Sequence, residues 1–127
     1  MPVAADLYYH TYHEDIYPPV VLIHGAGGNH LYWPSEIRRL AGFHVYALDL
    51  PAHGKSGGLA QQSIEAYAGA VIAWLDSIGL HRAIFIGHSM GGAIIQVLAL
   101  DHPEHVLGLG LIASGAKLRV APQLLDY

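Results

Sequence analysis

The chain has 127 residues, and a domain typically contains about 100 to 150 residues, so the sequence contains one domain at most. Charged residues make up 13% of the chain, against about 25% in typical globular proteins, and apolar residues make up 53%, which excludes a disordered chain. The net charge is −4 and the six Lys and Arg residues form no basic stripe, which excludes nucleic acid as a partner.

The N-terminal residues lack the basic start and the long apolar core of a signal peptide, so we expect a cytoplasmic protein. The longest apolar stretches, residues 94–100 and 106–113, are far shorter than the roughly 20 residues that cross a bilayer. We therefore expect no membrane-spanning segment. The chain has no cysteine, which excludes disulfide bonds and thiolate metal sites.

Short β-branched apolar runs alternate with helical patterns along the chain, which is typical of parallel strands joined by crossover helices. The sequence therefore predicts an α/β fold with a mostly parallel sheet of about five strands and crossover helices on both faces. The predicted strands are residues 7–12, 20–23, 44–48, 83–86 and 107–112. The predicted helices are residues 34–41, a longer helix that Ser63 caps and Gly79 ends, and residues 90–100.

Residues 87–92 read Gly-His-Ser-Met-Gly-Gly, a G-x-S-x-G motif between a predicted strand and a predicted helix, as in a nucleophile elbow. Such a turn exposes Ser89 and crowds the backbone, so a Cβ atom at Gly87 or Gly91 would clash. A glycine-rich turn with an incidental serine is the alternative. The agreement of motif, strand and helix favours the elbow.

Residues 24–28 read His-Gly-Ala-Gly-Gly and follow another predicted strand, in a loop that frees backbone N–H groups. Acyl transfer needs two such donors aimed at the developing oxyanion, and the candidates are the N–H groups of Ala26 and Met90. A dinucleotide-binding turn is the alternative, but it would need a glycine where His30 stands. Similarly, a P-loop that ends in residues 54–56 would need a glycine in place of Asp49.

These motifs resemble the α/β-hydrolase family, specifically serine esterases and lipases with an HG-x-GG loop and a G-H-S-M-G-G elbow. The resemblance extends over nearly the whole chain and includes Trp33 and residues 49–56 and 114–119. One departure is Ala52, where many relatives carry glycine. The resemblance implies that the enzyme needs no cofactor and that its site contains the nucleophile Ser89, the oxyanion-hole donors Ala26 and Met90, and the loop-shaping residues His24, Gly25, Gly87 and Gly91.

In this family the acid and the histidine base follow the nucleophile in the sequence. Only His102 and His105 follow Ser89, on or just after the third predicted helix, whereas the family's base lies on a loop after the last strand. The acids available after the elbow, Asp101, Glu104 and Asp126, do not directly follow the last predicted strand either. We therefore expect residues 1–127 to be the N-terminal half of a hydrolase domain that ends where a cap begins, with little turnover on its own.

The sequence contains ten histidines, but no H-E-x-x-H pattern, so we expect no metal site. His88 precedes the nucleophile, and adjacent residues at such a turn point apart, so we expect it to pack locally rather than to act as the base. His53 has two interpretations. It either lines the cleft or orders its own loop.

The leading hypothesis is a serine hydrolase that cleaves a small carboxylic ester through an acyl-enzyme on Ser89, with acid and base supplied by a missing C-terminal half. Two alternatives remain open. A C–C bond hydrolase or perhydrolase of the same family would keep Ser89. A non-catalytic fragment or ligand-binding module would explain the absent base.

The resemblance places the last predicted strand, residues 107–112, in the middle of a larger sheet. In this chain we expect that strand to be an unpaired apolar edge, which favours association with another polypeptide. The expected partner is the complementary C-terminal half as a second chain, or another copy of this chain in a homo-oligomer.

Overall fold

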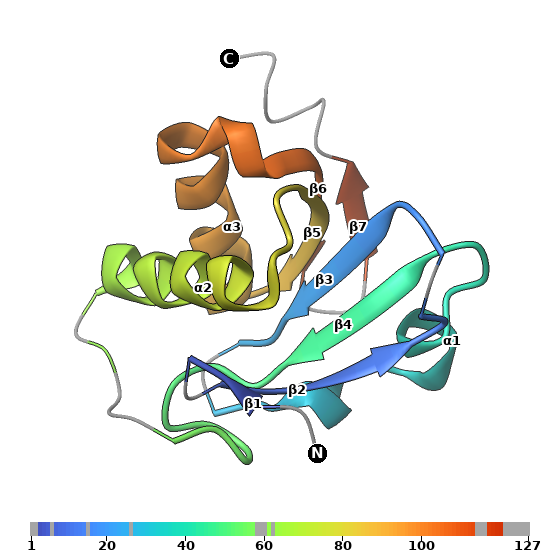
Figure 1. Ribbon diagram of the computed structural model, residues 1–127, viewed down its shortest axis with the longest axis horizontal. Helices are drawn as coiled ribbons and strands as arrows, with labels where there is room; N and C mark the ends of the chain where they lie inside the picture. The colour runs from blue at the N-terminus through green and yellow to red at the C-terminus, as the bar shows by residue number, and fades with distance from the viewer. Residues whose placement is uncertain are drawn as a thin grey trace.

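The computed structural model describes residues 3–5, 7–14, 16–25, 27–57, 61, 63–113 and 117–120. Within these residues one seven-stranded sheet crosses the molecule in the order β1-β2-β4-β3-β5-β6-β7 (Figure 1). The strands are β1 (Val3–Ala4), β2 (Leu7–Tyr12), β3 (Pro19–Ile23), β4 (His44–Leu48), β5 (Ala83–His88), β6 (Val106–Ala113) and β7 (Lys117–Val120).

The four central strands, β4, β3, β5 and β6, are parallel to one another, and the strands outside them pair antiparallel. This confirms the α/β fold and the mostly parallel sheet. All five predicted strands are present, with two further strands at the edges. The sequence does not reveal β1 and β7 because two and four residues are too few to show an alternation.

The predicted unpaired edge at residues 107–112 is wrong over its C-terminal half. There β7 pairs antiparallel with β6, from Gly110 opposite Val120 to Ala113 opposite Lys117. Three residues separate the two strands in the sequence, a length typical of a hairpin connection, so the chain itself supplies hydrogen-bond partners to this part of β6. The first half of β6 has no strand on its outer side among the described residues.

The helices follow the sequence pattern closely. The helix α2 (Ile64–Ile78) begins where Ser63 Oγ accepts a hydrogen bond from the Ala66 N–H (3.1 Å) and ends at Gly79, whose φ is 71°. The helix α3 (Met90–Asp101) is one residue longer than predicted. The helix α1 (Ser35–Arg38) is shorter than the predicted 34–41, because Arg39 already leaves the helical conformation with φ −109° and ψ 32°. None of the helices in the described ranges has the length and apolar character needed to cross a membrane.

The helices cover both faces of the sheet, as predicted. Figure 1 shows α2 and α3 packed on one face and α1 beside the other. Strand β3 is buried along its whole length and contributes alternate residues to the two cores. Val21 and Ile23 pack towards α2 and α3, and Val20 and Leu22 pack with Trp33. This central strand therefore fixes the position of the loop that follows it.

Candidate active site

Ser89 lies at the sharp turn between β5 and α3, with φ 56° and ψ −116°. A residue other than glycine is strained at such a positive φ, and strain of this kind is typical of functional sites. The neighbouring backbone is too close for side chains. A Cβ atom at Gly87 would collide with the backbone of Gly91, and one at Gly91 would collide with the carbonyl oxygens of Ile23 and His24. Both glycines are therefore required by the geometry of the turn.

The N-terminus of α3 provides a hydrogen-bond donor next to Ser89. The first intrahelical bond runs from the Ala93 N–H to Ser89 O (3.2 Å), so the N–H of Met90 lies in the first turn, where a helix has no acceptor for it. The helix dipole adds partial positive charge at this end. Both effects favour a negatively charged atom next to Ser89.

The loop after β3 lies directly against Ser89. A Cβ atom at Gly25 would be 3.1 Å from the Cβ of Ser89. The Gly28 N–H donates to Gly25 O (3.0 Å), and Gly27 has a φ of 76°, so the loop forms a tight turn. The structure thus brings Gly25 and Ser89 together, while Ala26, the other predicted oxyanion donor, lies outside the described residues.

His24 is completely buried and ties this loop to the loop after β4. Its Nε2 accepts a hydrogen bond from the Leu50 N–H (3.0 Å), so the ring carries its proton on Nδ1, which donates to Gly25 O (2.7 Å). Burial is the largest influence and lowers the pKa of His24 below its ordinary value, although the bond to Gly25 acts in the opposite direction. His24 therefore holds the loop as a neutral ring.

The loop after β4 is organised by the buried carboxylate of Asp49. Its Oδ1 accepts from the His30 N–H (2.5 Å) and lies 2.9 Å from His30 Nδ1, and its Oδ2 accepts from the Lys55 N–H (2.9 Å). A Cβ atom at Gly54 would collide with this carboxylate. Ala52 has a φ of 62°, in the region that glycine adopts most easily. The described contacts of Asp49 are thus structural.

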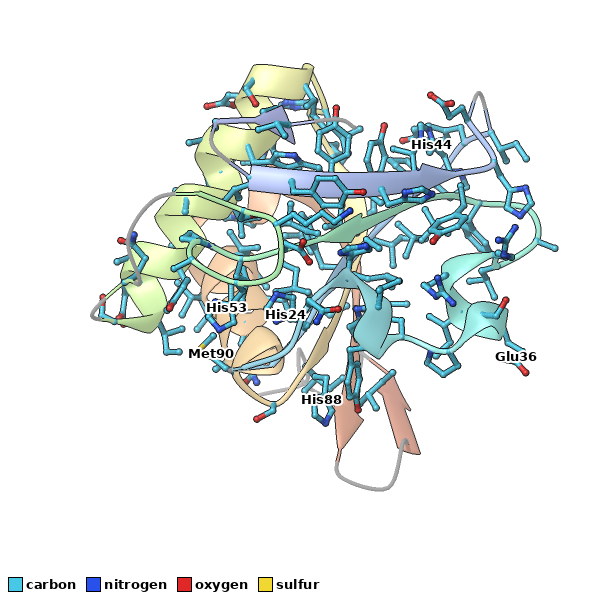
Figure 2. All side chains as sticks on the ribbon, turned by 90° about the horizontal axis from the view of Figure 1, so that it is seen from below. His24, Glu36, His44, His53, His88 and Met90 are labelled. Carbon is cyan, nitrogen blue, oxygen red and sulfur yellow. The ribbon has the colours of Figure 1, made fainter. Side chains whose placement is uncertain are left out.

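His53 lies on the same loop and reaches across to the loop after β3. Its Nε2 accepts from the Gly27 N–H (3.0 Å), and its Nδ1 lies 2.9 Å from Pro51 O. Figure 2 shows His53 beside His24, and their ring centroids are 5.1 Å apart. Of the two interpretations from the sequence, the structure shows the ordering of loops, because His53 lines neither of the pockets beside Ser89.

Ser89 lies between two pockets of about 260 and 270 Å³. The first also contains Tyr32 and His88, whose rings stack with centroids 4.6 Å apart. The Nδ1 atom of His88 is buried and has no hydrogen-bond partner in the described part of the chain. His88 thus packs locally, as the sequence predicts. The second pocket is lined by Gly87, Gly92, Ala93, Gln96, Leu111 and Ile112.

No histidine ring in the described part of the chain forms a hydrogen bond with the Ser89 hydroxyl. His102 and His105 follow the C-terminal end of α3, and a helix of 12 residues is about 18 Å long, whereas Ser89 precedes its first residue. His44 lies at the opposite end of the sheet (Figure 2). The described residues also contain no group of three His, Asp or Glu side chains that could hold a metal ion.

Sequence reasoning missed Tyr32 and the hydrogen bonds that join the two loops. The loops follow β3 and β4, which are parallel neighbours, so both lie at the same edge of the sheet. That adjacency is a signal that could have predicted contact between His24 or His53 and the opposite loop. Nothing in the sequence indicates that Tyr32 stacks on His88.

Residues 18–126 match the alpha/beta hydrolase fold family. The chain belongs to this family. It is 34% identical over 118 residues to a pimeloyl-[acyl-carrier protein] methyl ester esterase of Vibrio atlanticus, covering 92% of this chain and 43% of the relative. It is 41% identical over 96 residues to the dihydrolipoyllysine-residue acetyltransferase component of the acetoin cleaving system of Cupriavidus necator, covering 74% of this chain and 26% of the relative.

A solved marine microorganism esterase superposes with a TM-score of 0.76 at 29% identity, covering 84% of this chain and 41% of that structure. The chain therefore spans less than half the length of these alpha/beta hydrolase relatives. The match confirms the family that the elbow and the glycine-rich loop indicate, and esterases are among its members similar to this chain.

The lowered pKa of His24 predicts a pH dependence of stability. Folding keeps this ring neutral, so below its unfolded pKa of about 6.5 the unfolded chain binds a proton that the folded protein does not. The contribution of His24 to the free energy of unfolding should therefore be constant well above about pH 6.5. It should decrease as the pH falls from there to the lowered folded pKa, by at most about 1.4 kcal/mol per pH unit.

Urea unfolding of the protein between about pH 5 and 8 measures this dependence, with His24→Gln as the variant that cannot titrate. The pH profile of His24→Gln should be flatter than that of the unchanged protein. Ser77→Ala, at a residue that does not titrate, is the control and should keep the original profile. Parallel profiles for His24→Gln and the unchanged protein would contradict the prediction.

Proposed function

We propose that the protein is a serine hydrolase that cleaves small carboxylic esters through an acyl-enzyme on Ser89. The observation that carries the proposal is the strained conformation of Ser89, with φ 56°, at the point where Gly25 of the glycine-rich loop and the N-terminus of α3 meet. Membership of the alpha/beta hydrolase family, with esterases among similar proteins, supports the same reaction class.

In the proposed reaction, Ser89 Oγ attacks the ester carbonyl carbon while its proton passes to a base. The carbonyl oxygen becomes an oxyanion, and the N–H groups of Met90 and Ala26 are the proposed donors to it. Each such donor contributes about 2.7–4 kcal/mol to the stability of a transition state. The alkoxide then leaves and takes up the proton, and water attacks the acyl-enzyme to release the acid and restore Ser89.

The two pockets on either side of Ser89 suit the two parts of an ester. Leu111, Ile112 and Ala93 give the second pocket an apolar wall, with Gln96 as its polar side chain. An acyl or alkyl chain can pack against such a wall. The first pocket, with Tyr32 and His88, would accept the other part of the substrate.

The proposed mechanism also needs a histidine base and its carboxylate partner. Among the described residues no histidine ring is hydrogen-bonded to the Ser89 hydroxyl, and the similar methyl ester esterase is more than twice as long as the region that this chain matches. We therefore propose that residues 1–127 are the N-terminal part of a hydrolase domain and that the acid and the base come from further polypeptide. Without the base, a serine triad loses up to about six orders of magnitude in rate.

Reaction with a fluorophosphonate probe tests the role of Ser89. We expect the protein at its full natural length to bind one probe on Ser89, as mapped by peptide mass spectrometry, because the probe reacts with activated serine nucleophiles. Ser89→Ala should abolish the reaction. Ser77→Ala should not change it, because the Ser77 hydroxyl donates to Trp74 O on α2. A folded full-length protein with unlabelled Ser89 would favour a non-catalytic ligand-binding module instead.

We further propose that the 127-residue chain associates with a second polypeptide. Ile84 and Ile86 of β5 are half-buried, Leu107 of β6 is 38% exposed and Leu100 of α3 is 78% exposed. Each 100 Å² of apolar surface left in water costs about 2.5 kcal/mol. A complementary half of the domain or a second copy of this chain would cover these residues.

Native mass spectrometry and light scattering at micromolar concentration test this association. We expect the isolated 127-residue chain to have a mass of at least two chains, because apolar surface in water favours self-association. Addition of the complementary part of the domain should replace this homo-oligomer by a one-to-one complex. A monomer that melts cooperatively would show that the seven strands form a sufficient core.

A further inference from the structure

Two histidines make reciprocal hydrogen bonds between the loops beside Ser89. His24, in the loop after β3, accepts at Nε2 from the Leu50 N–H of the loop after β4 (3.0 Å). His53, in the loop after β4, accepts at Nε2 from the Gly27 N–H of the loop after β3 (3.0 Å). Each loop thus provides one ring and one backbone N–H to the other.

Both rings are held in the same tautomer. Because each Nε2 accepts a backbone N–H, the proton of each neutral ring lies on Nδ1. From there it is donated to Gly25 O in His24 (2.7 Å) and to Pro51 O in His53 (2.9 Å). A proton added to either Nε2 would face another N–H group and remove the bond between the loops.

The bond from Gly27 matters because little else restrains that residue. Gly27 is exposed, has a φ of 76°, and a Cβ atom built on it would meet nothing within 4 Å. Glycine also has the largest conformational freedom of any residue. The turn bond from Gly28 to Gly25 lies within the loop, so it does not fix the loop relative to the rest of the molecule. The His53 ring provides an external contact.

We infer that His53 is a positioning residue, which holds Gly27 of the glycine-rich loop in place beside Ser89 by accepting its N–H. Its effect on catalysis rests on the proposed serine hydrolase function, but the hydrogen bond and the order of the loop do not. His53 acts through the backbone of Gly27 and touches none of the reacting atoms.

The His53 ring is itself packed between two neighbours. Its centroid lies 5.1 Å from that of His24 in the neighbouring loop and 6.4 Å from that of Tyr67 of α2. These contacts help to fix the ring that accepts the Gly27 N–H.

The bond is measured directly by NMR on the protein at its full natural length, with nitrogen-15 in glycine and histidine. We expect a scalar coupling between Gly27 N and His53 Nε2, and ring shifts of the Nδ1-protonated tautomer. A Gly27 amide with no coupling to His53, or ring shifts of the Nε2-protonated tautomer, would overturn the inference.

Variants separate positioning from a general structural role. His53→Ala should increase the exchange rate of the Gly27 amide about five- to tenfold, as expected for one lost hydrogen bond, and should slow the labelling of Ser89. His53→Gln offers an acceptor oxygen for the Gly27 N–H, so it should restore both rates. His13→Ala, at a histidine bonded to Arg39 O, is the matched control and should behave as the unchanged protein.

The outcomes distinguish the two proposals. If the coupling is present but Ser89 never reacts with the probe, the serine hydrolase proposal fails and His53 still orders the loop. If Ser89 reacts and His53→Ala leaves both the Gly27 exchange rate and the labelling rate unchanged, the positioning role is wrong. If His53→Ala does not fold, the coupling in the unchanged protein and the two rates of His53→Gln decide the question.

Discussion

The close approach of Gly91 to the end of β3 is the contact on which the candidate site depends. A Cβ atom at this position would collide with the carbonyl oxygens of Ile23 and His24, so α3 can begin here only if residue 91 is glycine. The approach joins the helix after Ser89 to the strand that carries the glycine-rich loop. It therefore determines the distance between the proposed nucleophile and Gly25, which also lies against Ser89.

The remaining features of the site stabilise this arrangement. Strand β3 lies between β4 and β5, so the loops after all three strands meet at one edge of the sheet. Hydrogen bonds from His24 and His53 join two of these loops, and the buried carboxylate of Asp49 orders the loop that carries His53. The strained backbone of Ser89 is thus held by contacts of neighbouring segments, which is how such strain persists in folded proteins.

Much of this arrangement could be predicted from the sequence, because local chemistry determines it. A glycine at position 79 indicates the positive φ that ends α2, and a serine at position 63 indicates the cap that begins it. The glycines on either side of Ser89 indicate the tight turn. The β7 hairpin, the early end of α1 and the bond from Gly27 to His53 are different. They depend on which segments meet in space. A segment of about four residues is also too short to show a periodic pattern from which its structure could be predicted.

The free energy of unfolding of Gly91→Ala, measured against Gly108→Ala, tests most directly whether the tight contact below Ser89 determines the fold of the site. A Cβ atom at Gly108 of β6 meets nothing within 4 Å, so Gly108→Ala should change the free energy of unfolding by less than about 0.5 kcal/mol. Gly91→Ala should lower it by about 3 kcal/mol or more, because the backbone must move apart. Equal stability of the two variants would contradict this account of the site.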